Sequence, residues 1–174
     1  MQSEVLFLGG RSGAGKSSVA FELHAQLAVL KVKHCVIEGD NLDLAFPRPW
    51  EHHLAERNLA AIWANYRALG YRRMIYTNTV SVRFTQELAA AMGDEPRITA
   101  VLLTATDEIS SARLGGRIQG SDLQEHLDRS NTAAKELERL TPRWVHRVPT
   151  DNRSVQDIAA DLLPLNGWTA NLAG

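Results

Sequence analysis

Residues 10–17 read GRSGAGKS, between an apolar stretch, VLFL at residues 5–8, and an amphipathic stretch from residue 17 onward. A strand, a glycine-rich turn ending in Lys-Ser and a helix, in this order, let successive backbone N–H groups converge on a phosphate. Gly13 and Gly15 permit backbone angles and a close approach that a Cβ would hinder. We therefore predict a phosphate-binding loop (P-loop) that joins the first strand of an α/β fold to its first helix.

The residues of this loop have separate expected roles. Lys16 supplies positive charge to the β- and γ-phosphates of a nucleotide, and Ser17 offers a hydroxyl to Mg²⁺. The alternative is a glycine-rich turn in which Lys-Ser occurs by chance. The motif itself, its position near the first strand and the flanking strand and helix each support a P-loop independently. The nucleotide is expected to be ATP, because no N-K-x-D guanine-recognition motif is present. The predicted nucleotide-binding residues of the loop are Gly10, Arg11, Ser12, Gly13, Ala14, Gly15, Lys16, Ser17 and Ser18.

Outward from the loop, short apolar runs alternate with helix-period segments, which is typical of a parallel sheet with crossover helices. We predict an α/β three-layer sandwich with a five-stranded parallel sheet in the order 2-3-1-4-5 and right-handed crossovers. With the P-loop at residues 10–17, this arrangement resembles the P-loop fold of the nucleoside and shikimate kinases. Residues 1–174 are expected to form a single domain, with a loose tail from residue 166. Strands are predicted at 5–8, 34–38, 73–77, 97–103 and 144–148, and helices at 17–30, 51–69, 82–92, 107–114, 122–140 and 154–163.

Composition narrows the function classes. The chain carries 19 basic and 20 acidic residues, for a formal charge of -1, so no bulk basicity indicates a nucleic-acid partner. No stretch approaches a membrane span, and the first residues lack the basic start of a signal peptide. We expect a soluble, cytoplasmic protein without a membrane partner. Cys35, the single cysteine, is expected to be an inert core residue, and the sequence does not predict an oligomeric state.

Acidic residues follow the second predicted strand, where an open α/β sheet has its ligand crevice. A carboxylate there can accept the proton of an acceptor hydroxyl or hold the metal. Asp40 is the first candidate for both tasks, Glu38 the second and Asp43 the third. The alternative for Asp40 is a turn-shaping role.

A basic, glycine-containing segment at about residues 113–122 predicts a lid. Phosphoryl transfer needs positive charge over the migrating group, and a hinged segment can deliver it while excluding water. Arg117 is therefore a candidate catalytic residue and Arg113 a candidate nucleotide ligand. The alternative is a solvated basic turn between two helices.

An acceptor molecule would lie against the ends of strands two and three. The recognition-type residues expected there are Glu38, Arg57, Asn58, Thr77 and Asn78. Each of them singly has the alternative of an ordinary surface residue. The six histidines show no metal-ligand spacing, so no zinc site is predicted.

The chain resembles two groups of small-molecule P-loop kinases and ATP-binding proteins. GRSGAGKSS at 10–18, EGDN at 38–41 and a helix bearing Arg57-Asn58 are similar to adenylylsulfate kinases, and this resemblance implies that Asp40 lies beside the transferred phosphate. FELHAQL at 21–27 and TDNRSVQDIA at 150–159 resemble the tunicamycin-resistance ATP-binding proteins. The wider kinase pattern implies that residues 150–153, Asn152 among them, lie near the adenine.

The first resemblance has gaps where adenylylsulfate kinases hold their sulfate nucleotide. Arginines of that family are replaced by Ala55, Ala60 and Ala61, and its F-I-S-P turn by the sequence TNTV at 77–80. Adenylylsulfate is therefore not the expected acceptor.

Together these features predict an ATP- and Mg²⁺-dependent kinase that phosphorylates a hydroxyl of a small metabolite or antibiotic. Two other classes stay open. One is a nucleotide-dependent protein that sequesters a ligand without chemistry, favoured by the lack of an acidic residue in the third and fourth predicted strands. The other is a regulatory NTPase, which strong activation of hydrolysis by a protein partner would reveal.

Overall fold

The computed structural model describes residues 2–47, 49–115 and 123–169. Its sheet has five parallel strands in the order β2-β3-β1-β4-β5, as predicted. The predicted strand boundaries agree to within one or two residues, the usual uncertainty at element ends. The strands are β1 (Glu4–Gly10), β2 (Cys35–Glu38), β3 (Arg73–Thr77), β4 (Arg97–Thr104) and β5 (His146–Pro149).

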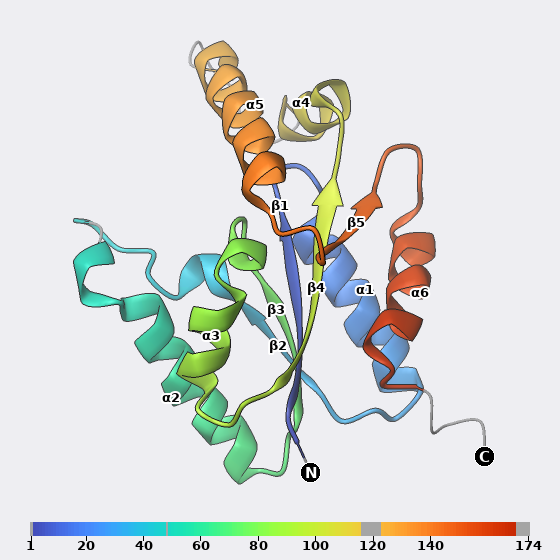
Figure 1. Cartoon of the computed structure of the whole chain (residues 1–174). Helices are drawn as coiled ribbons and strands as arrows, with labels where there is room; N and C mark the ends of the chain where they lie inside the picture. Colours follow the sequence, from blue (N-terminus) through green and yellow to red (C-terminus); the bar gives the residue numbers. More distant parts are fainter. Residues whose placement is uncertain (1, 48, 116–122, 170–174) are drawn as a thin grey trace.

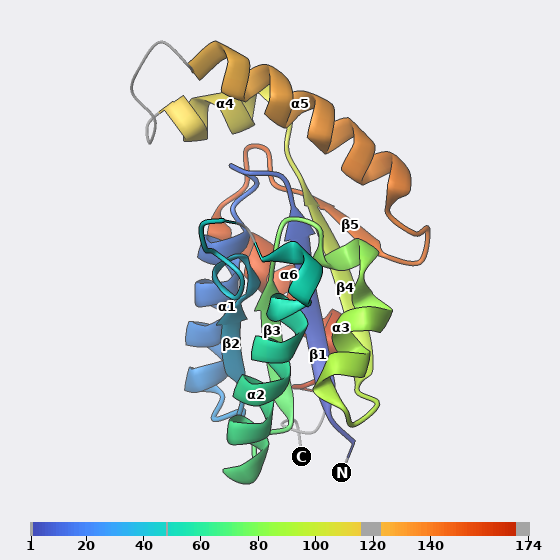
Figure 2. The same cartoon turned by 90° about the vertical axis from the view of Figure 1, so that its left-hand side faces the viewer.

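Helices cover both faces of this sheet, so the predicted three layers are confirmed (Figure 1). Helices α1 and α6 lie on one face and α2 and α3 on the other, while α4 and α5 extend beyond the carboxyl ends of β1 and β4 (Figures 1 and 2). The helices are α1 (Lys16–Val29), α2 (Leu54–Ala68), α3 (Thr85–Met92), α4 (Asp107–Gly115), α5 (Leu123–Leu140) and α6 (Val155–Asn166).

A hydrophobic core lies on each face of the sheet, and strand β1 contributes side chains to both. Val5 and Phe7 point into the core under α2 and α3, whereas Leu6 and Leu8 point into the core under α1 and α6. Alternate side chains leave a strand on opposite faces, so a strand buried on both sides needs a continuous apolar run. The run at residues 5–8 therefore fixes β1 in the centre of the sheet and places the P-loop at its carboxyl end.

The helix predicted over 51–69 is interrupted. His53 has a φ of 48°, which separates a 3₁₀ turn at Trp50–His52 from α2. The sequence predicts an apolar stripe on this helix formed by Ala55, Leu59, Ile62, Tyr66 and Leu69. The buried stripe differs from it, since Trp63 is fully buried while Leu69 is exposed. Cys35 is buried as expected, and burial raises the pKa of its thiol to about 12, so the thiol stays protonated and unreactive.

The tail predicted from residue 166 is wrong for its first residues. Helix α6 continues to Asn166 despite Pro164, and Gly167 ends it with a φ of 67°. Trp168 then turns back into the core under α1 and α6, where it is buried. Burial of a large aromatic ring stabilises the fold by more free energy than ordering this turn costs. The chain therefore remains packed against the core beyond the end of α6.

Ser154 caps α6. The sequence predicts this cap, because an acidic residue follows Ser154 three positions on, at Asp157, in a variant of the capping box. Its Oγ accepts a hydrogen bond from the N–H of Asp157 at 3.0 Å and donates to the Asp157 carboxylate at 2.6 Å. Ser154→Ala should lower the free energy of unfolding by about 1 kcal/mol, because an N–H of the first turn loses its acceptor. Urea unfolding measures this change, and Gln156→Ala, on the same helix but outside the cap, should change stability by less than about 0.5 kcal/mol.

In the described part of the chain, no helix combines the length and the apolar character needed to cross a membrane.

Candidate active site

The P-loop runs from the end of β1 into α1. Gly13 and Gly15 have φ values of 81° and 93°, in the region that a Cβ disfavours, and Gly15 is the residue that caps the helix. Helix α1 begins at Lys16, so its free N–H groups and the positive end of its dipole face the loop. This backbone can cradle an anion, as the sequence motif requires.

Lys16 is held inside the loop. Its side chain is only 9% exposed, and its Nζ donates to the carbonyl oxygens of Gly10 at 2.9 Å and Arg11 at 3.4 Å. Burial lowers the pKa of the Lys16 ammonium, and the carboxylates of Asp40 and Glu38 partly oppose that shift. A desolvated ammonium between carbonyls and carboxylates is an electrostatic site for a polyphosphate.

A cavity of about 500 Å³ lies against this loop. The loop and the start of α1 form one wall, and the segment from the end of β5 to the first turns of α6 forms another. This volume falls within the usual range for a small-molecule site. The lining residues are Ser12, Gly13, Ala14, Gly15, Lys16, Ser17, Ser18, Val19, Asp40, Arg113, Thr150, Arg153, Val155 and Ile158.

The segment after β5 partly departs from the prediction. Asn152 is exposed, has a φ of 55° and does not line the cavity. Thr150 and Arg153, in the same segment, do line it. The predicted strand order already places the fifth strand beside the fourth. This order is the signal from which Thr150, at the end of the fifth strand, could have been predicted to lie at the cavity.

Arg113 on α4 connects two walls of the cavity. Its Nη1 donates to the carbonyl oxygen of Gly13 at 3.1 Å and to Thr150 Oγ1 at 3.2 Å, and its Nη2 donates to Thr150 O at 3.2 Å. The guanidinium therefore holds the tip of the P-loop against the end of β5. The rest of the predicted lid, residues 116–122 with Arg117, lies outside the described residues.

Arg113→Ala should weaken binding of a non-hydrolysable ATP analogue by about tenfold, the scale of lost hydrogen bonds to a charged group. Isothermal titration calorimetry measures the change. Arg113→Lys should recover only part of the affinity, because an ammonium cannot reproduce the guanidinium fork. Arg139→Ala, on the last turn of α5, should bind like the unmodified protein, and equal losses in both alanine variants would contradict a specific role for Arg113.

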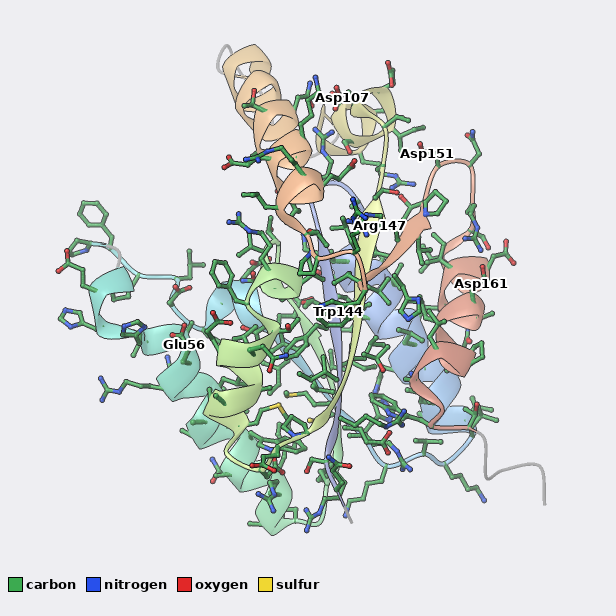
Figure 3. All side chains as sticks on the ribbon, in the orientation of Figure 1. Glu56, Asp107, Trp144, Arg147, Asp151 and Asp161 are labelled. Atoms are coloured by element: carbon green, nitrogen blue, oxygen red, sulfur yellow. The ribbon has the colours of Figure 1, made fainter. Side chains whose placement is uncertain are left out.

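Arg11 departs from its expected role as a nucleotide ligand. Its side chain is 5% exposed and turns to α4 and α5, with Nη1 2.5 Å from Asp107 Oδ1 and Nη2 bonded to Asn131 Oδ1. Figure 3 shows Asp107 at this end of the molecule. Only its backbone belongs to the loop, and its charge is used to attach the loop to the helices above the sheet. Gly10, likewise, does not line the cavity but accepts the Lys16 bond.

Asp40 reaches the same cavity from the other side. It lies in a 3₁₀ turn, Gly39–Asn41, directly after β2. Its Oδ1 accepts hydrogen bonds from Asn78 Nδ2 at 2.9 Å and from the N–H of Thr79 at 3.3 Å. In the described part of the chain its Oδ2 has no such bond. One oxygen thus fixes the carboxylate and the other can take part in binding.

The remaining predicted acceptor residues lie near Asp40 but differ in accessibility. Asn78 orients Asp40, and Asn58 Nδ2 donates to the carbonyl oxygen of Leu42 at 2.6 Å, which fixes the loop after the 3₁₀ turn. Thr77 is 2% exposed at the end of β3, so its side chain belongs to the interior. Arg57 is exposed on the first turn of α2. The geometry thus gives Asn58 and Asn78 positioning tasks, whereas Thr77 is an interior residue at the end of β3.

Glu38 has a distinct environment. Its Oε1 is buried and has no hydrogen-bond partner among the described residues. Its charge acts on Lys16. Glu38 therefore contributes to the field around the lysine, while Asp40 alone of the three candidate acids lines the cavity.

The chain is similar to known proteins in part of its sequence and in its fold. The adenylylsulphate kinase family model matches residues 2–63, and no curated protein matches the chain significantly. The tunicamycin resistance protein of Deinococcus radiodurans has a similar structure, with a TM-score of 0.63 and 19% identity over 94% of this chain and 95% of that chain. The chain has a P-loop kinase fold.

Two further P-loop kinases have the same fold. The adenylylsulfate (APS) kinase of Mycobacterium tuberculosis, solved with AMPPNP and APS, has a TM-score of 0.56 and 18% identity over 94% of this chain and 97% of that chain. The shikimate kinase of Acinetobacter baumannii, solved with shikimate, has a TM-score of 0.56 and 16% identity over 94% of this chain and 92% of that chain. At identities this low, structural similarity shows a shared fold and does not show a shared acceptor. The acceptor of this chain therefore has to be inferred from its own residues.

Proposed function

We propose that this P-loop protein is an ATP- and Mg²⁺-dependent kinase that transfers the γ-phosphate to a hydroxyl of a small molecule. The observation that supports it is the meeting of three groups in one cavity: the P-loop amides, the buried Lys16 and the anchored Asp40. A phosphate-binding wall and a proton acceptor facing each other are what phosphoryl transfer requires.

In the proposed reaction the acceptor oxygen bonds to the γ-phosphorus while the bond to the β–γ bridging oxygen breaks, and ADP leaves. Asp40 accepts the hydroxyl proton through its free Oδ2. Lys16 and the loop amides stabilise the negative charge on the phosphates, and Arg113 keeps the loop in place. Arg117 is proposed to add positive charge from the lid.

The Ser17 hydroxyl and the Asp40 carboxylate line the same cavity, and hard oxygen donors of this kind suit Mg²⁺. When bound, the ion would neutralise phosphate charge. Asp40 would then act on the metal directly or through water, in addition to its proposed task as base.

A screen in two steps tests the proposal. Thermal-shift measurements with Mg²⁺ and a non-hydrolysable ATP analogue identify small molecules that raise the melting temperature further, since ligands of the folded state stabilise it. Mass spectrometry after incubation of these molecules with Mg-ATP then detects a phosphorylated product. ATP-enhanced binding with no product would support sequestration instead, and hydrolysis that only a protein partner accelerates would support a regulatory NTPase.

A further inference from the structure

A second cavity, of about 330 Å³, lies at the edge of the sheet that β2 forms. Strand β2 lies between α1 and α2 (Figure 2), and side chains from all three elements line the cavity. Five of the lining residues carry rings: Phe21, His24, His34, Tyr66 and Tyr71. None of these five lines the cavity at the P-loop, and the volume is within the usual range for a small-molecule site. We call this second site the edge cavity.

Aromatic rings from two helices form its walls. Phe21 and His24 are three positions apart on α1, so they lie on the same side of that helix. Tyr66 lies on α2, and Gly70, with a φ of 82°, turns the chain so that Tyr71 returns to it. The Tyr71 N–H donates to the carbonyl oxygen of Tyr66 at 3.1 Å, and the two rings pack edge-on with centroids 5.2 Å apart. Rings in this arrangement favour a flat aromatic ligand, which can stack on one ring and meet another with its edge.

The two histidines of the edge cavity have a defined hydrogen-bonding pattern. His34 Nδ1 is 2.7 Å from the carbonyl oxygen of Val32, and a carbonyl oxygen can only accept, so Nδ1 carries the hydrogen. Burial lowers the pKa of His34, so this ring is neutral at neutral pH and its Nε2 has a free lone pair. His24 Nδ1 is 2.9 Å from that Nε2 and therefore donates to it. A neutral His24 thus has its hydrogen on Nδ1 and a lone pair on Nε2.

The Nε2 atom of His24 is an acceptor that this pattern leaves available. Within the described ranges no hydrogen bond involves it, and the His24 side chain is exposed. The hydroxyls of Tyr66 and Tyr71 can donate or accept, so they suit either kind of ligand group. An unprotonated imidazole nitrogen can only accept, so His24 favours a ligand that donates.

We propose that the edge cavity binds a small ligand with a flat aromatic ring and an N–H or O–H donor, which packs against Phe21 and the two tyrosines and donates to His24 Nε2. The ring contacts bury apolar surface, and the single directed hydrogen bond gives selectivity. This inference goes beyond the proposed function, because neither the nucleotide nor its acceptor would occupy the edge cavity.

Three probes of nearly equal size test the predicted donor. Indole has an N–H, whereas 1-methylindole and benzofuran have none. Their binding is followed by protein-observed NMR with saturating ATP analogue at about pH 8.5, above the range in which an ordinary histidine titrates. We expect all three to shift the amides of residues 21–24, 34–36 and 66–71, and indole to bind about fivefold more tightly, the scale of one neutral hydrogen bond.

Two variants report on the residues of the edge cavity. His24→Phe keeps a ring but removes the acceptor, so the fivefold preference for indole over the other probes should disappear. Phe21→Ala should weaken binding of all three probes about fivefold through the lost ring contact. The Phe21 side chain is 56% exposed, so its removal leaves the cores intact. Phe84→Ala, which removes an exposed ring that does not line the edge cavity, should change nothing.

Several results would overturn this inference. They are equal affinity for the three probes, a preference for indole that persists in His24→Phe, equal losses in Phe21→Ala and Phe84→Ala, or no binding of indole. Displacement of indole by the ATP analogue, or amide shifts confined to the P-loop, would also overturn it, because the probe would then occupy the nucleotide site. Failure to bind the ATP analogue would count against the proposed function alone, since the indole measurements can be repeated without nucleotide.

Discussion

Lys16→Ala should reduce the affinity for ATP on the order of 10²-fold or more. The Lys16 ammonium is buried in the P-loop, and removing one partner of a buried charged contact costs several kcal/mol in binding, which corresponds to this factor. In the Lys16→Ala protein, only the loop amides would bind the phosphates, because the positive charge of the ammonium is missing. Isothermal titration calorimetry with a non-hydrolysable ATP analogue measures the loss.

The same residue allows a control for folding. Because burial lowers the pKa of Lys16, the unfolded chain binds its proton more tightly than the folded one. Below the folded pKa the charged lysine costs stability in full, and that cost disappears as pH rises toward the ordinary value of 10.5. Lys16→Met should therefore be at least as stable as the unmodified protein at neutral pH.

Loss of nucleotide binding in a Lys16→Met protein of unchanged or raised melting temperature would assign the effect to the phosphate site. A melting temperature that falls together with affinity would instead make Lys16 a structural residue. Unchanged affinity in both variants would remove the P-loop from the proposed function altogether.

The parts of the fold that could be predicted from the sequence are those that depend on residues close together in the chain. The glycines and Lys16 of the P-loop, the strand at Arg73–Thr77 and the cap at Ser154 each depend on neighbours within a few positions. The predicted strand order is confirmed, and it depends on the likeness to P-loop kinases, because general rules for parallel sheets set the handedness of the crossovers and not the order of the strands.

The features that could not be predicted depend on partners far along the chain. Arg11 lies in a phosphate-binding motif, yet its side chain pairs with Asp107, 96 positions away. Trp168 follows a helix end and a glycine, which is typical of a tail, but the core it fills is built by α1 and α6. Local patterns report which backbone forms, whereas side-chain direction is set by packing that only the assembled fold contains.

For the candidate site, the sequence placed Asp40 at the end of a strand and named Asn78 beside it. It could not show that Asn78 bonds to Asp40 across 38 positions, nor that Tyr76 passes over Gly39. Both depend on the register between β2 and β3, which pairs Glu38 with Thr77. A one-residue shift in this register would reverse every side chain, so the site depends on packing of the whole strand pair.

Asp40→Asn should lower kcat on the order of 10²-fold or more while leaving the affinity for the ATP analogue within about threefold, because general-base catalysis contributes on this scale. The amide oxygen of asparagine can still accept the bonds from Asn78 and Thr79, so the local geometry is kept. What asparagine lacks is the second basic oxygen, which would take the proton of the acceptor hydroxyl.

Two further variants distinguish the proposed base, Asp40, from the residue that orients it, Asn78, and from the alternative base, Glu38. Asn78→Ala removes the 2.9 Å bond that orients Asp40, so it should lower kcat by a smaller factor, about tenfold. Glu38→Gln should retain more activity than Asp40→Asn, because Glu38 does not line the cavity. Steady-state kinetics across pH 5–9 measures all three, and full turnover in Asp40→Asn together with loss in Glu38→Gln would transfer the role of base to Glu38.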